Sequence, residues 1–307
     1  MKKSKFKFID LFAGIGGMRI PFDELGGTCV FTSEFDKFAQ QTYEANFHII
    51  PEGDITQIDE KKIPPHDLLL AGFPCQAFSH AGLKKGFEDT RGTLFFDIAR
   101  ILKHHKPKAF LLENVKGLKS HDGGNTLKTI MSVLEDDLKY NVIEPKVLNA
   151  KDFGLPQNRQ RIFIIGFRNH TDFEFPEPPK NTTRLGKILH KRTSDKFTIS
   201  DRLWASHQKR KKRARAKGYG FGYSLFNRDS EYTSTISARY YKDGSEILIE
   251  QKDKNPRMLT RREAARLQGF PEHFLIPVSK GQAYKLFGNA VPVNVIRALA
   301  KKITKLL

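Results

Sequence analysis

Apolar runs typical of buried strands alternate with helix-like segments from residue 6 to about residue 168. The helix-like segments, such as residues 35–46 and 94–105, repeat their apolar residues at the three-to-four-residue spacing of one helix face. A chain that alternates strands with helices forms βαβ units, whose strands join in a largely parallel sheet. The strand-like runs are FKFIDLF, CVFTSE, DLLLAGF, AFLLENV and RIFIIGF. We therefore expect an α/β fold for this part of the chain.

The composition changes after residue 172. The stretch FEFPEPPKNTTR, residues 173–184, is rich in proline and polar residues and is typical of a linker or a domain boundary. A basic segment follows at residues 207–226, and residues 232–250 read as strand, with KDG as a hairpin turn. We expect a smaller, mostly β domain over residues 173–255.

Helical patterning returns after residue 256. Thr260 followed by Glu263 is the pattern of a capped helix start. A last helix is expected from about Pro292 to Leu307, since proline suits a first helical turn. The expected organisation is thus a domain of residues 1–172, the mostly β domain, and a C-terminal segment of residues 256–307 whose last helix packs back on the first domain.

The charge of the chain indicates a polyanionic partner. Lys and Arg number 53 against 34 Asp and Glu, which leaves a net charge of +19. Neutralised phosphates release counterions, so this excess favours nucleic acid. No apolar run approaches the ~20 residues of a membrane span, and no lipidation motif supports a membrane partner. With two cysteines, Cys29 and Cys75, a disulfide framework is not expected, and a reducing cytoplasm is the simplest location.

The segment FIDLFAGIGGMR, residues 8–19, is a strand that enters a glycine turn and then a helix. Gly14 and Gly16 would let backbone N–H groups approach a ligand closely, or they would merely join strand to helix. Glu34, at the end of the next strand, lies where a ribose-binding acid belongs, and is otherwise a solvated carboxylate. Asp54 could accept from an adenine amino group or cap a helix. The G-x-G-G spacing favours a small nucleoside ligand such as S-adenosylmethionine over a dinucleotide.

Cys75 stands where the run LLLAG breaks into a loop. A free cysteine usually packs as a small apolar residue, but a thiolate at the carboxyl edge of a parallel sheet is a nucleophile. Glu113, at another strand end, would be partly desolvated and could hold a proton. Arg159 and Arg161, two residues apart, would share one side of an extended segment and form either a surface patch or a donor cluster that orients Glu113.

Six blocks in order resemble the conserved blocks of the cytosine-C5 DNA methyltransferases, from about residue 6 to the C-terminus. They are FIDLFAGIGG, GFPCQAFS, ENV, QNRQRIF, REAARLQGFP and GNAVPVNV. The resemblance implies a Rossmann-like S-adenosylmethionine-dependent methyltransferase domain with a smaller target-recognition domain. It also implies a sequence-specific enzyme of the bacterial restriction-modification type, with double-stranded DNA as substrate and S-adenosylmethionine as cofactor.

The resemblance assigns roles to individual residues. Cys75 attacks carbon 6 of a flipped-out cytosine, Glu113 helps to place a proton on N3, and Arg161 binds O2 with Arg159 beside it. The cofactor pocket is expected to be lined by Phe12, Gly14, Gly16, Glu34, Phe35, Asp54, Pro74, Leu94 and Asn289. No metal is expected.

Contacts to DNA are expected from three parts of the chain. Gln76 and Ser79 begin a glycine-bearing loop that would close over the flipped base. Lys209 and Arg210, within the basic run that ends at Lys217, would touch phosphate, and Arg239 would make a bidentate contact to guanine. The segments GFGYSLF and SARYYKDGSEILIE resemble the recognition segments of family members that read CCGG, CCWGG or CCNGG.

Two other functions remain open from the sequence: a tRNA cytosine methylase of the same fold, and a DNA-binding protein without activity. The recognition region of about 80 residues disfavours the first. The presence of Cys75, Glu113, Arg159 and Arg161 disfavours the second. A restriction endonuclease acting on the same site is expected as a functional partner without a direct complex, and a monomer is expected because one flipped base needs one active site.

Overall fold

The computed structural model describes residues 5–74, 94–179, 183–220 and 222–307. Within it the chain forms two compact units. The first comprises Met1–Leu148, Gln160–Glu177 and Val295–Leu307, and the second comprises Asn149–Arg159 and Pro178–Asn294. We describe each unit by itself.

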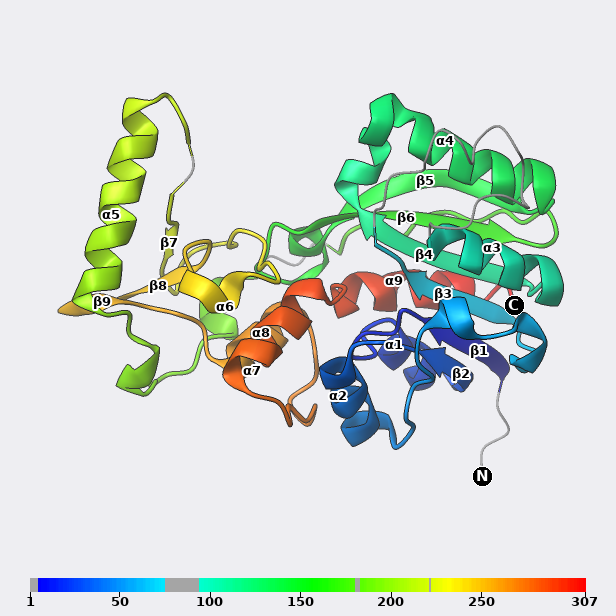
Figure 1. Ribbon diagram of the computed structural model, residues 1–307, viewed down its shortest axis with the longest axis horizontal. Coiled ribbons are helices and arrows are strands. Elements are labelled where there is room, and N and C mark those ends of the chain that lie inside the picture. Colours follow the sequence, from blue (N-terminus) through cyan, green and yellow to red (C-terminus); the bar gives the residue numbers. More distant parts are fainter. Residues whose placement is uncertain (1–4, 75–93, 180–182, 221) are drawn as a thin grey trace. The chain divides into compact units, whose positions relative to one another are not determined.

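A six-stranded sheet forms the centre of the first unit, in the order β2-β1-β3-β4-β6-β5 (Figure 1). β1 pairs in parallel with β2 and β3, β3 pairs in parallel with β4, and β6 runs antiparallel to β4. The strands are β1 (Phe6–Leu11), β2 (Gly27–Ser33), β3 (Leu68–Gly72), β4 (Ala109–Val115), β5 (Asn141–Asn149) and β6 (Gln160–Phe167). The predicted alternation of strands and helices is confirmed.

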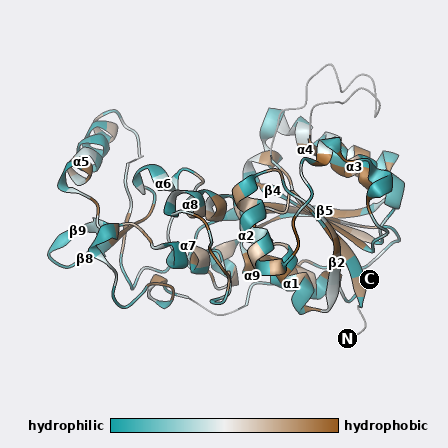
Figure 2. Ribbon diagram, turned by 60° about the horizontal axis from the view of Figure 1, so that its bottom comes forward, coloured by the Kyte–Doolittle hydropathy of each residue, from teal (hydrophilic) through white to brown (hydrophobic). Residues whose placement is uncertain are grey.

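Helices cover both faces of this sheet. They are α1 (Arg19–Glu24), α2 (Lys37–Phe47), α3 (Leu94–His105), α4 (Asn125–Ser132) and α9 (Val293–Ile303). On one face, α3 and α4 bury apolar side chains against Ile9, Leu69 and Leu112 in a single core cluster. Phe8 points to the opposite face, where its ring lies 5.9 Å from that of Phe22 in α1. Figure 2 shows the hydrophobic strands enclosed between these helices.

The helix α9 joins the first unit through one apolar stripe. Its residues Val295, Ile296, Leu299, Ala300 and Ile303 are fully buried, at helical spacing. On its polar side Arg297 donates two hydrogen bonds to the carboxylate of Glu24 at the end of α1 (2.8 and 2.9 Å). The last helix therefore packs with the sheet, as the hydrophobic pattern of this segment requires.

Cys29 is a structural residue of β2. Its side chain is buried, and its thiol lies 3.3 Å from the Phe31 carbonyl oxygen and 4.0 Å from the Tyr43 hydroxyl. Burial raises the pKa of Cys29 to about 12, with a further rise from the nearby Asp10. Such a thiol stays protonated and unreactive at neutral pH.

The buried side chain of His66 should make the free energy of unfolding of the first unit depend on pH. It is 9% exposed, its Nδ1 donates to the Pro64 carbonyl oxygen (2.8 Å), and burial lowers its pKa to about 4. Because the unfolded chain takes up this proton near pH 6.5 and the folded chain only near pH 4, the free energy of unfolding falls as the pH falls between these values. The slope from this group approaches ~1.4 kcal/mol per pH unit. Urea titrations between pH 4 and 8 should show this slope reduced in His66→Asn; an unchanged slope contradicts the assignment.

The second unit contains a three-stranded sheet in the order β7-β8-β9. β7 (Leu225–Phe226) runs parallel to β8 (Leu248–Gln251), which is antiparallel to β9 (Lys254–Arg257). The α-helices are α5 (Asp201–Ala216), α6 (Tyr240–Asp243), α7 (Arg261–Leu267) and α8 (Lys280–Asn289).

The mostly β character expected for residues 173–255 is corrected by these elements. The basic run forms α5, a helix of 16 residues, because Lys, Arg and Ala are strong helix formers and Ser200 caps the start by accepting from the Leu203 N–H. The KDG sequence is not a hairpin turn. It ends the short helix α6, where Gly244 takes the left-handed conformation (φ 65°).

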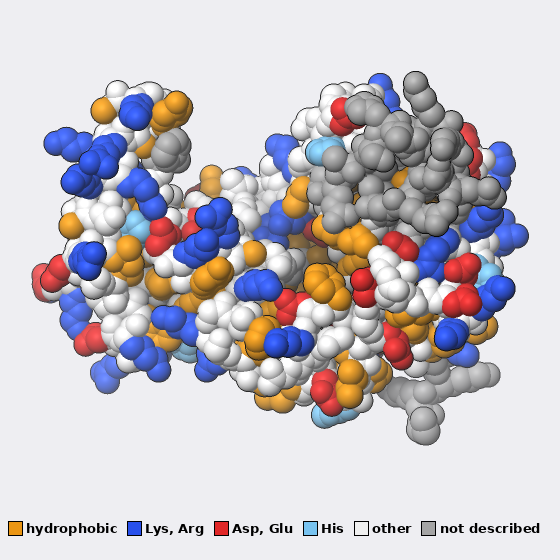
Figure 3. Space-filling view, in the orientation of Figure 1, with side chains coloured by type: hydrophobic (Ala, Val, Ile, Leu, Met, Phe, Trp, Pro, Cys, Tyr) orange, Lys and Arg blue, Asp and Glu red, His pale blue; other side chains and the backbone are white. Residues whose placement is uncertain are grey.

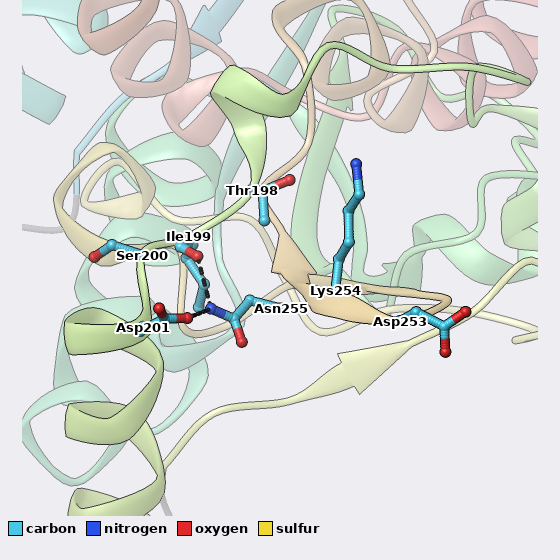
Figure 4. A pocket seen from close by; sticks show the side chains of 7 residues that line it. All are labelled: Thr198, Ile199, Ser200, Asp201, Asp253, Lys254 and Asn255. Atoms are coloured by element: carbon cyan, nitrogen blue, oxygen red, sulfur yellow. Dashed lines mark hydrogen bonds between the residues drawn. The ribbon is translucent and has the colours of Figure 1, made fainter.

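A polar pocket of about 670 Å³ lies where α5 begins beside β9 (Figure 4). Its groups mostly satisfy one another: the Asn255 amide donates to the Asp201 carboxylate (2.6 Å) and to the Ile199 carbonyl oxygen (3.2 Å). These bonds attach α5 to β9. We assign this pocket a structural role.

A buried ion pair fixes the start of α7. Arg257 donates two hydrogen bonds to the Glu263 carboxylate (2.8 and 2.9 Å), and Thr260 and Glu263 form the predicted capping box. Burial alone would raise the pKa of Glu263, but the Arg257 guanidinium and the backbone N–H groups of Thr260 and His190 together hold this pKa below its usual value. The pair joins β9 to α7.

Candidate active site

The parallel strands β1, β2, β3 and β4 all end at the same edge of the sheet. The chain turns from β1 toward β2 on one side and reaches β3 on the other, so β1 and β3 border a switch point. Ligands of open α/β sheets bind outside the carboxyl ends of the strands at such a point. The glycine turn, Glu34, Pro74 and Glu113 all occur at or just after these strand ends.

Glu34 closes the turn between β1 and the loop after β2. Its carboxylate accepts hydrogen bonds from the backbone N–H groups of Gly14 and Asp36, both at 2.8 Å. Burial raises the pKa of Glu34 above its ordinary value, against these two hydrogen bonds, which lower it. Because a carboxylate offers about four acceptor sites, two bonds leave it able to accept from the hydroxyls of a sugar. The structure thus gives Glu34 a fixed orientation.

The glycine turn is built so that a ligand can approach it. Gly14 has a φ of +55°, and a Cβ added there would meet nothing within 4 Å. Gly16 has a φ of +79°, and a Cβ there would lie 2.2 Å from the Phe47 ring of α2. Gly14 therefore borders open space, whereas Gly16 permits close packing of the turn on α2.

A cavity of about 220 Å³ opens beside Glu34. The described residues that line it are Phe12, Ser33, Glu34, Phe35, Gly53, Asp54, Ile55 and Leu94. Five of the predicted cofactor residues are in this lining. Phe35 is 75% exposed, and the buried Ser33 hydroxyl has no partner among the described residues, so each is left available to a ligand. A volume below the ~300–1,000 Å³ of small-molecule sites indicates that these residues hold one part of a ligand.

Asp54 combines two of the roles considered for it. Its carboxylate accepts from the Thr56 N–H (3.0 Å) and so caps a short 3-10 helix, Ile55–Gln57. Its side chain also lines the cavity. The sequence alternatives of a cap and a ligand contact are therefore compatible.

Glu113 and Arg161 form an ion pair across β4 and β6. Glu113 lies opposite Phe163 in the antiparallel register, and Arg161 is two residues from Phe163, so both side chains project from the same face. Arg161 Nε donates to Glu113 Oε1 at 2.9 Å, and both side chains are largely buried. The prediction that an arginine orients Glu113 agrees with this geometry.

Gly72 and Asn114, which were not among the predicted site residues, lie beside this pair. Gly72 leaves space for the Glu113 carboxylate, and Asn114 binds the chain that precedes Pro74. Gly72 pairs with Glu113, and a Cβ at Gly72 would lie 3.3 Å from Glu113 Oε2, so glycine leaves room for the carboxylate. Asn114 donates from its amide to the Phe73 carbonyl oxygen at 2.9 Å, in a buried bond. Its position beside Glu113 at a strand end was the available signal. Asn114 thereby fixes the residue that precedes Pro74.

Arg159, predicted to lie beside Arg161, binds backbone carbonyl groups of the second unit. It precedes β6, belongs to the second unit and is 1% exposed. Its guanidinium donates to the carbonyl oxygens of Ile236 (3.1 Å), Gly288 (2.9 Å) and Ala290 (2.7 Å). Residue 159 lies just before β6, so the two-residue repeat of side chains along a strand does not extend to it. Among the described residues these bonds of Arg159 fix backbone segments, and its predicted role beside Arg161 at the base stays a prediction.

The remaining predicted residues of the active site and cofactor pocket are either outside the described residues or exposed. Cys75, Gln76 and Ser79 lie outside the described residues. Pro74 is exposed just after β3, and Asn289 is exposed at the end of α8 in the second unit.

Three of the residues predicted to bind DNA, Lys209, Arg210 and Arg239, are exposed in the second unit. Lys209 and Arg210 are on α5, and Figure 3 shows Lys and Arg side chains gathered over this helix. Arg210 also pairs with Asp243 (3.0 Å), so part of its charge is balanced. Arg239 is exposed at the N-cap of α6. In the described part of the chain, no helix is long and apolar enough to cross a membrane.

The first unit is thus a Rossmann-like α/β fold with a glycine turn, a fixed acid and a Glu–Arg pair at one edge of its sheet. The chain belongs to the C-5 cytosine-specific DNA methylase family, whose model matches residues 6–305. It is 61% identical to the type II methyltransferase M.DsaV of Dactylococcopsis salina, over 99% of this chain and 87% of that one. It is 62% identical to M1.ScrFI of Lactococcus lactis subsp. cremoris, over 100% and 80%. The chain is accordingly a DNA cytosine-5-methyltransferase of the restriction-modification type.

Solved structures share its fold. An Entamoeba histolytica methyltransferase, EhMeth, has a TM-score of 0.78 at 19% identity and covers 99% of both chains. The Dnmt2 methyltransferase of S. pombe has a TM-score of 0.77 at 19% identity and covers 98% of both. The predicted methyltransferase fold is confirmed.

Proposed function

We propose that this chain transfers a methyl group from S-adenosylmethionine to carbon 5 of a flipped-out cytosine, through a covalent bond between Cys75 and carbon 6. The Glu113–Arg161 pair is the observation that carries the proposal, since it holds a carboxyl group at the edge where β3 leads to Cys75. In this account residues 1–172 are catalytic, residues 173–255 recognise the target, and residues 256–307 complete the fold.

The Cys75 thiolate adds to carbon 6 while Glu113 helps to deliver a proton to N3, and Arg161 donates to the O2 of the base. S-adenosylmethionine supplies the methyl group that carbon 5 takes. S-adenosylhomocysteine is the leaving group of this transfer. Loss of the carbon 5 proton to water, return of the N3 proton to Glu113 and expulsion of the thiolate then restore the aromatic ring. The cytosine must leave the duplex first, because carbon 6 is inaccessible within the stack.

The residues of the cavity beside Glu34 fit the cofactor. Glu34 can accept from ribose hydroxyls, Phe35 offers an exposed ring to the adenine, and Gly14 leaves open space at the turn. The Ser33 hydroxyl, buried without a partner among the described residues, can bind a polar atom of the ligand. By the family resemblance, Pro74, Leu94 and Asn289 also take part in cofactor binding.

Three duplexes test the function and the proposed recognition sites CCGG, CCWGG and CCNGG together. One contains CCAGG, one CCCGG and one ACCGGT, and tritiated methyl transfer is measured on each. A CCNGG enzyme methylates the first two, a CCWGG enzyme only the first, and a CCGG enzyme the last two. Bisulfite sequencing then locates the modified cytosine. Transfer to tRNA but to none of the duplexes, nor to genomic DNA, contradicts the proposal.

The basic helix α5 is proposed to contact phosphate through Lys209 and its neighbours. Log affinity for nonspecific DNA falls linearly with log salt concentration, with a slope of about 0.9 per neutralised phosphate. Replacing Lys209, Lys212 and Arg213 by Gln should reduce this slope by about 0.9 for each lost contact. The matched control replaces Lys301 and Lys302 of α9, both exposed, and should keep the parent slope. A wild-type slope in the α5 variant contradicts the assignment.

A further inference from the structure

The Arg159 guanidinium joins two segments that the proposed function assigns to different ligands. Its Nη2 donates to the carbonyl oxygens of Gly288 (2.9 Å) and Ala290 (2.7 Å), the residues on either side of Asn289. Its Nη1 donates to the carbonyl oxygen of Ile236 (3.1 Å), three residues before Arg239. One buried side chain therefore holds both the loop with the cofactor residue and the segment with the base-reading residue.

A second set of bonds runs in parallel with the first. The Gln157 side chain accepts from the Ile236 N–H (3.0 Å) and donates to Gln268 Oε1 (3.1 Å). Gln268 in turn donates to the carbonyl oxygens of Phe287 and Ala290. Both glutamines are 0% exposed. Such a satisfied buried network allows little independent movement of its two ends.

The two segments also touch directly. A Cβ added to Gly288 would lie 2.3 Å from the Ser237 carbonyl carbon and 2.4 Å from the Ala238 nitrogen. Only glycine permits this approach of one backbone to another. A shift of residues 237–238 toward Gly288 must therefore displace it, and Gly288 is next to Asn289.

Hydrogen bonds of Ser237 connect such a shift to the backbone of Arg239. The Ser237 hydroxyl donates to Glu246 (2.7 Å) and accepts from the Arg239 N–H (3.1 Å). The Arg239 backbone is thus fixed to Ser237, while its side chain is exposed to a ligand.

We propose that Arg159 and Gly288 couple target recognition to cofactor binding, by linking the segment of residues 236–239 to the loop of residues 288–290. This inference rests on the proposed function, in which Asn289 serves the cofactor, and on the expectation from the sequence that Arg239 contacts a guanine. DNA that fixes Arg239 also fixes the Asn289 loop, so the cofactor binds more tightly to the enzyme on its correct site. By linkage, the cofactor increases the affinity for the correct site by the same factor.

The test measures this factor with S-adenosylhomocysteine as the probe. Calorimetry gives its Kd for the enzyme bound to the duplex that the wild type methylates, and for the enzyme bound to a scrambled duplex of the same length. The ratio of the two is the coupling factor, expected in the wild type at about 5–150-fold. Arg159→Lys keeps the charge but loses the planar fork that reaches three carbonyls, and should reduce the ratio by about 3–30-fold.

Two further variants make the test specific. Arg262→Lys is the matched control, because Arg262 also donates to two carbonyl oxygens of a loop in this unit, those of Pro271 (3.3 Å) and Phe274 (2.7 Å). It should keep the wild-type ratio. Ser237→Ala, a mild change, removes the hydroxyl that bonds Glu246 and the Arg239 N–H, but keeps every hydrogen bond to the Asn289 loop described above. It should lower the ratio while the Kd of the probe for the free enzyme stays the same.

The outcomes separate this inference from the proposed function. A wild type that methylates DNA but has a ratio of one overturns the coupling alone. Unchanged ratios in both Arg159→Lys and Ser237→Ala overturn it as well, as does an equal loss in Arg262→Lys. If Arg159→Lys does not fold, Ser237→Ala decides. A wild type that methylates no DNA removes the basis of both proposals.

Discussion

Replacing Glu113 with glutamine should reduce the rate of methyl transfer by about 10²–10⁴-fold, the range that general acid–base groups contribute. Glutamine keeps the shape of the side chain but cannot deliver a proton to the ring nitrogen, and it loses the charge that pairs with Arg161 Nε at 2.9 Å. Single-turnover transfer of a tritiated methyl group measures the effect. Binding of the duplex should change far less, because the proton is needed only as the adduct forms.

The matched control for this variant is Glu60→Gln. Glu60 forms another Glu–Arg pair of the first unit with a similar distance, 2.8 Å to Arg100, but lies on a 3-10 turn rather than on a strand. It should keep the wild-type rate. A rate for Glu113→Gln within the range of this control would contradict the role of Glu113.

Glu263→Ala should lower the free energy of unfolding of the second unit by about 3–5 kcal/mol. The reason is that Arg257, 5% exposed, loses the two hydrogen bonds that satisfy its charge, while Thr260 loses its capping partner. Urea titration followed by the fluorescence of Trp204, the single tryptophan of the chain, reports on this unit. The same pair makes stability depend on pH. Because the pKa of Glu263 is lowered in the folded chain, its contribution is full above the unfolded pKa and is lost as the pH falls through the folded one.

Glu272→Ala is the comparison for that stability measurement. Glu272 forms an equally short pair with Arg266 (2.7 Å), but its side chain is 64% exposed, and exposed pairs contribute about 0–1 kcal/mol. A loss for Glu263→Ala no larger than that of Glu272→Ala would show that the buried pair does not stabilise the unit.

The parts of the fold that could be predicted are those in which local pattern and burial agree. The strand β3 is apolar throughout and is buried on both faces, so its sequence has one structural solution. The capping box at Thr260 and Glu263 depends only on residues three apart. Glu34 was identified because a strand end and a glycine turn must meet at the carboxyl edge of a parallel sheet.

The parts that could not be predicted depend on contacts distant in sequence. The direction of the Arg159 side chain is set by carbonyl groups 77 to 131 residues away, which no local pattern records. The helix α5 could not be predicted because its polar composition shows little apolar periodicity. The Ser200 cap and the Asn255 hydrogen bonds, which stabilise it, are contacts that this periodicity does not record. Residues 232–250 have strand-forming residues, yet Gly244 allows the chain to end a helical turn there instead.

The most direct test of the account is the covalent bond to cytosine. The enzyme is incubated with S-adenosylmethionine and a duplex that carries 5-fluorocytosine at the methylated position, then separated on a denaturing gel. Fluorine at carbon 5 leaves no proton to lose, so the Cys75 thiolate cannot be expelled and the complex persists. We predict a denaturant-resistant complex for the wild type and none for Cys75→Ser. A complex that still forms with Cys75→Ser, or a wild type that methylates ordinary cytosine yet never forms the complex, would contradict the central claim.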